Sequence, residues 1–386
     1  MVGSISGGSL CSHFGRKIPL AIVGVIGGVG SSMGAFLPSQ YWELILVCRF
    51  LVGFSVGLGS SVCPLYVNEL APEARRGALS AVFQICITFG MVIANSITFI
   101  MHEHSTLAAS SNSAILMHLG TIINVVALVL SLTMPESSVW LAPGASLKSG
   151  SPEINDGGSK YGAETDSLLQ FGVSDLRGGW AGLFSRRHVK VLLTGIVMAV
   201  MLALTGINAV FLYATTLFEK NFKDKKELMS LLLYIFNFVC TIVAAAIVDR
   251  FPKKRLLLVG LAIMTVALCL LGVQVQWIAG EAGKWIGFVC LFTYVFGFAF
   301  GPGIVFWILV VQVFPESVRS QGSSLINLMQ WSENLLLTLV FPLVLKEIDI
   351  QFTYWAFAAV SVFSAVCLGI LLPGQKKFAS LDSLDD

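Results

Sequence analysis

The sequence predicts an all-α polytopic membrane protein, and three observations carry this prediction. Of its 386 residues, 56% are hydrophobic and only 12% are charged, whereas a soluble domain has about 25% charged residues. The mean hydropathy is +0.83. The apolar residues gather in long stretches, and a helix needs about 20 of them to cross the hydrocarbon core. Because lipid offers no hydrogen-bond partner to open backbone groups, each stretch is expected to be a helix.

Ten apolar stretches are long enough to span the bilayer. A shorter one, Val2–Cys11, precedes them and is rich in small residues. With about ten residues it cannot cross the core alone, so we expect it to be the last half of a helix whose start is absent. The predicted spans are 18–37, 42–63, 78–100, 114–134, 190–217, 229–248, 255–276, 285–312, 321–345 and 351–372.

Basic residues indicate the orientation in the membrane. Loops that face the cytoplasm carry an excess of Lys and Arg, so the more basic side is expected to be cytoplasmic. The opposite loops carry fewer, chiefly in the mixed-charge run 220–227. The residues that define the cytoplasmic side are Arg16, Lys17, Arg75, Arg76, Arg186, Arg187, Lys253, Lys254, Arg255, Arg319, Lys376 and Lys377.

A polar segment divides the chain into two helical halves. Residues 142–187 are rich in Gly, Ser and acidic residues, and most of this segment is too polar to span the membrane. We expect a cytoplasmic connector that is partly disordered or forms short surface helices. The predicted domains are therefore an N-terminal bundle at 1–141, the connector, a C-terminal bundle at 188–372 and a cytoplasmic tail at 373–386.

Two short motifs recur in the second half in the same order. Ser12–Lys17 and Asp249–Lys254 each lie between two predicted spans and end in basic residues. Glu69–Arg76 and Gln312–Arg319 share a Pro-Glu pair followed by Arg. Two matches in one order favour a duplicated bundle. Parallel repeats of this kind are typical of transporters that rock two halves around a midplane site.

No motif indicates enzymatic or metal chemistry. The eight cysteines lie in or beside apolar segments without a C-x-x-C pair, which is typical of buried small hydrophobic residues. His102 and His104 share a short polar loop, and no metal role is predicted for them. Because the sequence has no nucleophile elbow, Walker loop or metal cluster, we expect no enzymatic activity, no cofactor and no nucleic-acid partner. The expected partners are the lipid bilayer and a small solute.

The stretch 49–77 contains the most specific motif. Gly53 and Gly57 lie on one helix face, where small residues let another helix approach closely. Glu69 and the two arginines at 75–76 place charges at the membrane boundary. Each part alone indicates only helix packing or topology. Together they resemble the sugar-porter signature of the major facilitator superfamily, whose positions are filled by Gly53, Gly57, Tyr66, Glu69 and Arg76.

The resemblance extends over essentially the whole chain. It implies twelve helices in two six-helix bundles, with the first helix and part of the second absent here. It also implies a multi-pass carrier of a hexose or related polyol that works by alternating access, more often in the plasma membrane than in an internal membrane. The further matching segments are Gly15-Arg16-Lys17, Pro135–Leu141, Thr205–Phe211, and Gly301-Pro302-Gly303 followed by Trp307.

The resemblance also implies a set of solute-binding residues within the spans. Their chemistry fits a sugar, because amides donate to and accept from hydroxyls and an indole face packs on C–H groups. An amide within a span is costly unless it is paired or faces water. The implied residues are Asn95, Asn208, Tyr213, Asn237, Trp307, Gln330, Trp331 and Asn334.

Charged residues at the cytoplasmic side are implied to form a gate. In the first half they are Arg16, Lys17, Glu69 and Arg76, and their repeat partners are Asp249, Arg250, Lys253 and Arg319. Two further residues are candidates for coupling to protons. Arg49 would meet an acidic residue of the absent first helix. Glu333 is an intramembrane acid that is not a family feature, and it could contact the solute, exchange protons or extend into a wet lumen.

Several positions depart from the family pattern. Leu202 and Ala203 replace two sugar-binding Gln residues, and Ala299 replaces a Glu of the tenth helix. The cytoplasmic positions that differ are Ser12, Val139 and Gln312. Uniport and proton symport therefore both stay open, as do a carrier adapted to another small solute, a non-transporting sensor and a defective fragment. The connector has no recognisable signalling domain, which argues against a sensor.

Overall fold

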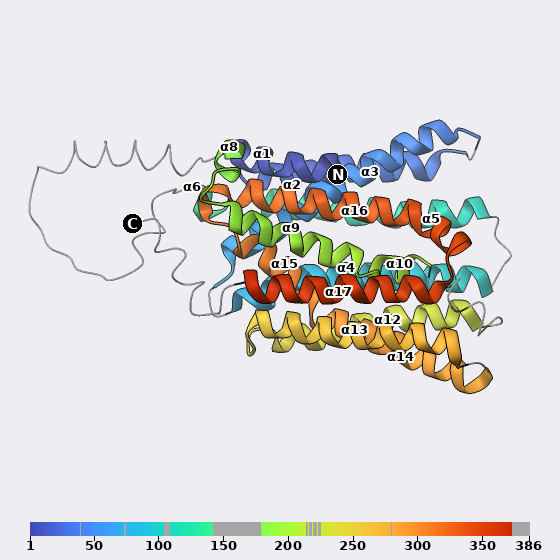
Figure 1. Cartoon of the computed structure of the whole chain (residues 1–386). Helices are drawn as coiled ribbons and strands as arrows, with labels where there is room; N and C mark the ends of the chain where they lie inside the picture. Colours follow the sequence, from blue (N-terminus) through green and yellow to red (C-terminus); the bar gives the residue numbers. More distant parts are fainter. Residues whose placement is uncertain are drawn as a thin grey trace, which may run out of the picture.

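The computed structural model describes residues 1–38, 40–72, 75–103, 109–141, 179–213, 215, 218, 222, 225–278 and 280–372. Within these residues every regular element is a helix, and most helices run side by side along one axis (Figure 1). Nine of the described segments are long and apolar enough to cross a membrane. The predicted all-α polytopic class is therefore confirmed.

The first half of the chain forms one group of helices. α2 packs on α3 and α5, and α1 packs on α3. Gly57 faces Ser4 of α1, so the small residue permits the predicted close approach, whereas Gly53 faces open space within the described part of the chain. The helices are α1 (Val2–Phe14), α2 (Lys17–Phe36), α3 (Trp42–Leu70), α4 (Arg76–Glu103), α5 (Ala109–Thr133) and the short α6 (Ser138–Leu141).

The second half begins with the short α8 (Gly179–Leu183) at the end of the predicted connector, most of which lies outside the described residues. α13 packs against α14 and α17, and α16 packs against α9. The remaining helices are α9 (Val189–Leu204), α10 (Ile207–Leu212), α12 (Lys226–Ile247), α13 (Lys253–Trp277), α14 (Gly280–Phe300), α15 (Pro302–Gln312), η4 (Glu316–Val318), α16 (Arg319–Glu347) and α17 (Ile350–Leu371).

Two spans that the sequence predicts as continuous are interrupted. The span 190–217 breaks after Thr205, where Gly206 has a left-handed φ of 89° and lies so close to the Phe357 ring that no Cβ would fit. The span 285–312 breaks at Gly301, before Pro302, which has no N–H to continue the ladder. Irregular backbone at membrane depth is tolerated where protein surrounds it, and both breaks are buried.

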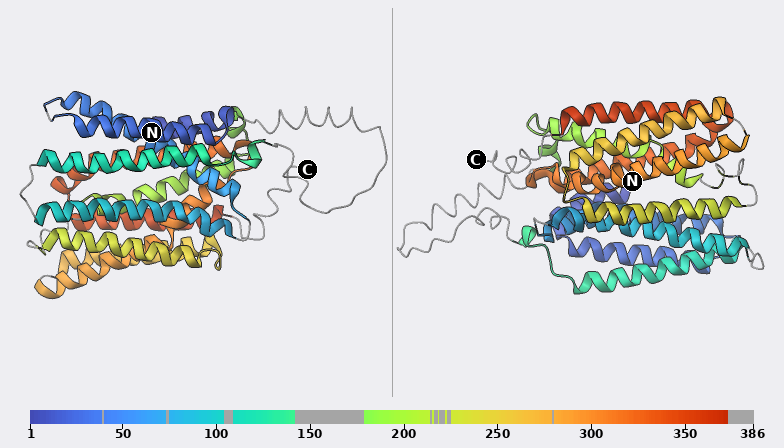
Figure 2. Two further views of the ribbon diagram at one scale, coloured as in Figure 1. Left: turned by 180° about the vertical axis from the view of Figure 1, so that it is seen from behind. Right: turned by 90° about the horizontal axis from the view of Figure 1, so that it is seen from below.

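The two halves meet along several helices. α1 lies against α16, α4 lies against α12 and α15, and α3 contacts α15 and α16. Figure 2 shows that α13, α14 and α17 lie on one side of the molecule and that α2 and α5 lie on the other. Gly7 and Gly8 of α1 sit directly against Ser324 and Ser320 of α16, so small residues allow the bundles to touch.

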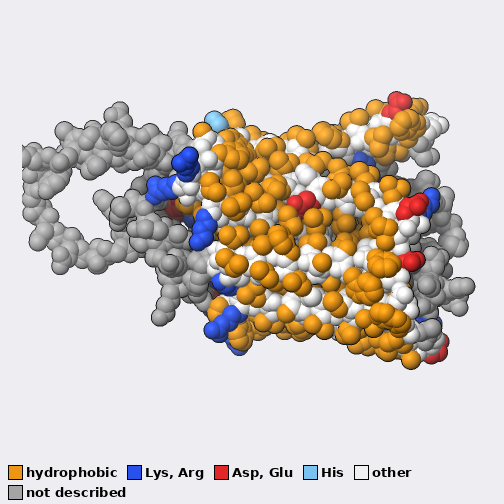
Figure 3. Space-filling view, viewed as in Figure 1, with side chains coloured by type: hydrophobic (Ala, Val, Ile, Leu, Met, Phe, Trp, Pro, Cys, Tyr) orange, Lys and Arg blue, Asp and Glu red, His pale blue; other side chains and the backbone are white. Residues whose placement is uncertain are grey.

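The surface separates into an apolar belt and a basic end. In Figure 3 the Lys and Arg side chains gather at the end of the molecule where α6 and α8 lie, and a broad hydrophobic belt separates them from the opposite end. This is the distribution that a multi-pass membrane protein has when its basic end faces the cytoplasm.

Candidate solute site and cytoplasmic gate

Two indoles from the C-terminal bundle donate hydrogen bonds to the N-terminal bundle in the interior of the molecule. Trp307 Nε1 of α15 donates to Gln84 Oε1 of α4 at 2.7 Å. Trp331 Nε1 of α16 donates to Ser60 Oγ of α3 at 3.0 Å. Phe83 packs edge-on against Trp307 with ring centroids 4.6 Å apart. The two bundles therefore share a polar and aromatic contact in the interior of the molecule.

Gln84 is a candidate site residue that the sequence did not single out. It is 6% exposed and bonded to Trp307. The amide that was expected on the same helix is Asn95. It lies eleven residues, or about three turns, after Gln84, so it is on the same helix face but about 16 Å farther along the axis. Asn95 is half-buried and donates to the Met91 carbonyl at 2.9 Å. The available signal was an amide inside a predicted span near its cytoplasmic end.

Several predicted site residues present acceptor oxygens without a partner. Asn237 of α12 is 1% exposed and Gln330 of α16 is 5% exposed. Within the described residues, Asn237 Oδ1, Gln330 Oε1 and Glu333 Oε2 are buried and accept no hydrogen bond. The same holds for Oδ1 of Asn327 in α16, which was not predicted as a site residue. Buried polar groups are normally paired. These oxygens can therefore accept hydrogen bonds from water or a ligand.

The remaining predicted residues line the C-terminal bundle toward the other end. The Tyr213 hydroxyl, just after α10, donates to the Thr338 carbonyl of α16 at 3.3 Å. Its ring lies 5.0 Å from that of Phe341. Asn208 and Asn334 are half-buried, and their side chains make no hydrogen bond to another described residue.

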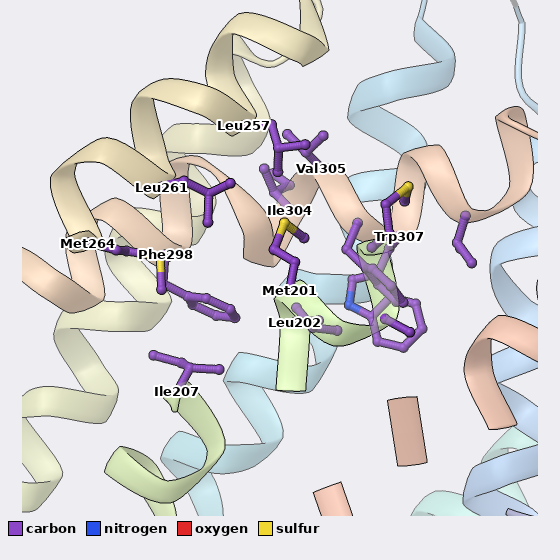
Figure 4. Packing of buried hydrophobic residues seen from close by; sticks show 14 of the residues in the cluster. Met201, Leu202, Ile207, Leu257, Leu261, Met264, Phe298, Ile304, Val305 and Trp307 are labelled. Carbon is purple, nitrogen blue, oxygen red and sulfur yellow. The ribbon is translucent and has the colours of Figure 1, made fainter. Parts of the chain in front are cut away.

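The substituted family positions are apolar and packed. Leu202 is 5% exposed, and Ala203 and Ala299 are almost fully buried. Figure 4 shows Leu202 beside Trp307, in a cluster with Met201. This part of α9 therefore offers an apolar wall to the site where two amides were expected from the family.

A buried ion pair holds the cytoplasmic end of the N-terminal bundle. Arg16, in the turn before α2, donates from Nε to Glu69 Oε2 at 2.8 Å and from Nη2 to Glu69 Oε1 at 2.5 Å. The Glu69 side chain is 2% exposed and that of Arg16 is 10% exposed. Ser137 Oγ donates to Glu69 Oε2 at 2.5 Å. Glu69 thus ties α3 to the α1–α2 turn and to the segment after α5.

Glu136, which follows α5, binds the start of α2 beside the Arg16–Glu69 ion pair. Its Oε1 accepts from the Arg16 backbone N–H at 2.8 Å, and its Oε2 accepts from that of Lys17 at 3.2 Å. A carboxylate at a helix N-terminus interacts favourably with the helix dipole. Gly15 has a φ of 77° and lies against this carboxylate, where a Cβ would collide. The motif around Glu136 was noted in the sequence, but its capping role was not.

In the C-terminal half, the matching loop reaches across to the other bundle. Asp249 Oδ2, after α12, accepts from the Ala78 backbone N–H of α4 at 2.9 Å. The repeat counterpart Ser12, in α1, accepts from Gln321 Nε2 in the first turn of α16 at 2.8 Å. Asp249 and Ser12 therefore each contact the first turn of a helix in the opposite bundle.

Two further contacts complete this end. Gln312 Nε2 donates to Asn68 Oδ1 at 3.3 Å, which joins α15 to α3. Arg319 stays within its own bundle, where Nε donates to the Phe314 carbonyl at 3.1 Å and Nη1 pairs with Glu316 at 3.4 Å.

The other predicted gate residues form no ion pair within the described part of the chain. The side chains concerned are those of Lys17, Arg76, Arg250 and Lys253. Lys254, which was predicted to mark the cytoplasmic side but not to belong to the gate, donates to the Gly369 and Leu372 carbonyls at 2.7 Å each and caps the end of α17. Arg49 of α3 is exposed and has no ion-pair partner among the described residues.

Comparison with known proteins agrees with this architecture. A profile of the family described as Sugar (and other) transporter matches residues 1–383. The chain is 30% identical over 384 residues to Plastidic glucose transporter 4 of Arabidopsis thaliana, an alignment that covers 95% of this chain and 66% of that protein. It is 26% identical over 395 residues to the Galactose-proton symporter of Escherichia coli strain K12, covering 100% and 82% of the two chains.

A solved structure shows the same fold. The proton:xylose symporter XylE of the major facilitator superfamily, bound to 6-bromo-6-deoxy-D-glucose, aligns with a TM-score of 0.82 at 22% identity. The alignment covers 98% of this chain and 86% of that one. The chain therefore belongs to the Sugar (and other) transporter family and has the major facilitator fold.

Proposed function

We propose that this member of the sugar-transporter family carries a neutral hexose or a related polyol by alternating access. The observation that supports this most directly is a set of buried side-chain acceptors without hydrogen-bond partners among the described residues. Asn237, Asn327 and Gln330 each have a buried side-chain oxygen without a partner among the described residues, and leaving such a group unpaired is costly. Hydroxyl donors of a polyol would satisfy them, and the indoles of Trp307 and Trp331 would cover its C–H face.

The remaining site residues extend this surface on both bundles. In our proposal Gln84 and Asn95 approach the solute from α4, and the C-terminal bundle provides the other contacts. The apolar wall at Leu202 and Ala203 favours a solute with one less polar face. The C-terminal residues assigned this role are Asn208, Tyr213 and Asn334.

The contacts at the basic end define the proposed gate. Asp249 binds the first turn of α4, Gln312 binds Asn68, and Ser12 binds Gln321. Opening toward the cytoplasm requires these bonds between the bundles to break. We therefore assign the described arrangement to the state closed on the cytoplasmic side, with residues 142–187 linking the halves.

The names of the relatives support a sugar as substrate class. One is named a glucose transporter and another a galactose-proton symporter. Proton coupling is therefore one candidate driving force. We place the protein in the plasma membrane in preference to an internal membrane.

A counterflow assay tests the proposal. Liposomes that contain the purified protein and are preloaded with an unlabelled hexose or polyol should take up the labelled form faster than liposomes without protein. Trp307→Leu should slow exchange about tenfold, because a loss of about 1.4 kcal/mol in binding corresponds to that factor. Trp277→Leu is the matched control, since Trp277 is 68% exposed. Absence of exchange across a broad panel of sugars and polyols, from folded protein, would contradict the proposal.

A further inference from the structure

Glu333 is a carboxylate in the middle of α16 that the proposed sugar site does not require. It is half-buried, and its Oε2 is buried without a hydrogen-bond partner among the described residues. Ionisable groups inside the membrane are rare and costly, and in transporters they mark ion or proton pathways. The role of Glu333 therefore depends on what it faces.

Two contacts of α16 fix the direction of Glu333. Toward the cytoplasm, the Ile326 side chain lies 2.8 Å from where a Cβ on Gly195 of α9 would be. Toward the outer end, Tyr213 donates to the Thr338 carbonyl. Glu333 lies between these contacts, seven residues after Ile326. Seven residues are about two turns and return to the same helix face within about 20°. Glu333 therefore faces the α9–α10 side at the depth where these helices meet.

The break between α9 and α10 lies at that depth. Gly206 adopts its left-handed φ there, and the Thr205 carbonyl accepts from the Tyr294 hydroxyl at 2.9 Å. Thr205 Oγ1 is a second buried group without a partner among the described residues. Movements between rigid segments are absorbed at a few residues where an element ends. A change of charge at Glu333 would act beside such a joint.

No described cation opposes Glu333 from the helices on this side. α9 beyond Lys190, α10 and α15 contain no titratable side chain, and the Tyr213 hydroxyl after α10 is already bound to α16. α1 and α3 pack on another face of α16, through Ser324 and Trp331. Their charged groups, among them the Met1 amino group and Arg49, therefore do not face Glu333.

We propose that Glu333 binds and releases the proton that couples solute movement to a proton gradient, an inference that rests on the proposed function. A proton from the outer water neutralises the carboxylate and removes an unpaired charge from beside the α9–α10 joint. The joint can then close over the solute. After the cytoplasmic gate opens, the proton leaves to the cytoplasmic water. The step transfers one proton and no electrons.

The test compares exchange with gradient-driven accumulation in liposomes. The protein is assayed beside Glu333→Gln and the matched control Glu347→Gln, whose carboxylate is exposed at the end of the same helix. The probe is the sugar or polyol that exchanges fastest in counterflow. An inward gradient of about one pH unit supports up to roughly tenfold accumulation at one proton per solute. The unmodified protein and Glu347→Gln should accumulate solute and acidify the lumen. Glu333→Gln should exchange solute but show neither effect.

Each outcome has a separate meaning. No counterflow from the folded, unmodified protein would contradict the proposed function itself. Counterflow without any effect of the pH gradient, or proton-driven accumulation by Glu333→Gln, would overturn the inference about Glu333. If Glu333→Gln fails to fold, Glu333→Asp replaces it. That variant keeps an acid on a shorter side chain and should shift the pH profile of uptake, and an unchanged profile would also overturn the inference.

Discussion

The two halves of the chain carry related cytoplasmic motifs, but the motifs make different contacts. In the N-terminal half, Glu69 forms a buried ion pair with Arg16 of the same bundle. At the matching place in the C-terminal half, Gln312 is neutral and binds Asn68 of the other bundle. Asp249 likewise crosses to α4. The N-terminal motif therefore stabilises its own bundle, whereas the C-terminal motif joins the two bundles.

This difference explains how the Arg16–Glu69 ion pair can affect closure of the cytoplasmic gate although it does not join the two bundles. Asn68, the partner of Gln312, directly precedes Glu69 at the end of α3. The ion pair fixes this end and so holds Asn68 where Gln312 can reach it. We infer that charge within the first bundle positions the acceptors, and that the second bundle docks on them.

Breaking the N-terminal pair should have the largest effect. Glu69→Gln leaves the Arg16 guanidinium nearly buried without its counter-charge, and removing one partner of a buried pair costs about 3–5 kcal/mol. The remaining bond from Arg16 to the Cys11 carbonyl offsets part of this. We expect a lower unfolding temperature and faster thiol labelling of Cys11, which is 1% exposed.

The control for this variant is Glu316→Gln. The Glu316 side chain is 41% exposed in its pair with Arg319, and exposed pairs contribute about 0–1 kcal/mol. Equal effects of the two variants would contradict the difference between the buried pair of the N-terminal half and the exposed pair of the C-terminal half.

Removing the buried acceptor Gln84 should have the next largest effect. Gln84→Met leaves the Trp307 N–H without its partner, and a buried unsatisfied group costs about 1–3 kcal/mol. We expect weaker solute binding together with a change in indole fluorescence. Thr98→Val, at an exposed position on the same helix, is the control. Unchanged binding in Gln84→Met would show that this contact does not belong to the solute site.

The cross-bundle cap at Asp249 should have a smaller, salt-sensitive effect. Asp249→Asn keeps an acceptor but removes the charge at the start of α4, and such a charge contributes about 0.3–1 kcal/mol at low ionic strength. Labelling of Cys11 should rise slightly, and the difference should shrink in high salt because exposed charges are screened. Asp349→Asn, at an exposed carboxylate before α17 without a cap hydrogen bond, should leave labelling unchanged. A salt-independent effect would argue against the dipole interaction.

Placing a carboxylate at Ser12, as Asp249 has at the matching position, should have the smallest effect. This change should slow Cys11 labelling, whereas the other cytoplasmic variants speed it. Ser12→Asp places a carboxylate beside the first turn of α16, as Asp249 does for α4. We expect it to slow Cys11 labelling by an amount that corresponds to about 0.3–1 kcal/mol. Ser12→Asn keeps an acceptor without the charge and separates the two contributions. Faster labelling in the aspartate variant alone would mean that this turn does not act as a helix-dipole site.

The sequence predicted the helices and the charged ends, but not the breaks within two helices. Hydropathy reports length and apolarity, so 190–217 and 285–312 were predicted as continuous spans. The distortions at Gly206 and Gly301 depend on the packing of other helices against them, such as the Phe357 ring against Gly206. That information is tertiary and is absent from local periodicity.

The types of residue in the candidate site could be predicted from the sequence, but not every residue that belongs to it. The family resemblance named Trp307, and the structure gives it a bonded partner, Gln84, which was not named. The partner of Arg16 was among the gate residues, whereas the contact of Asp249 with α4 was not foreseen. Charge patterns identify which residues are costly to bury, but the choice of partner follows from how the bundles dock.

The most direct test of this account is a distance measurement across the cytoplasmic end. Spin labels attached through non-natural amino acids at Leu70 and Phe251, both exposed, would report the separation of the two bundles by pulsed electron resonance. The unmodified protein should show mainly the short distance. Glu69→Gln should move more of the population to a longer distance than Asp249→Asn does. A Glu69→Gln distribution that matches the unmodified protein, or a larger shift in Asp249→Asn, would contradict the claim that the ion pair within the first bundle sets the closure.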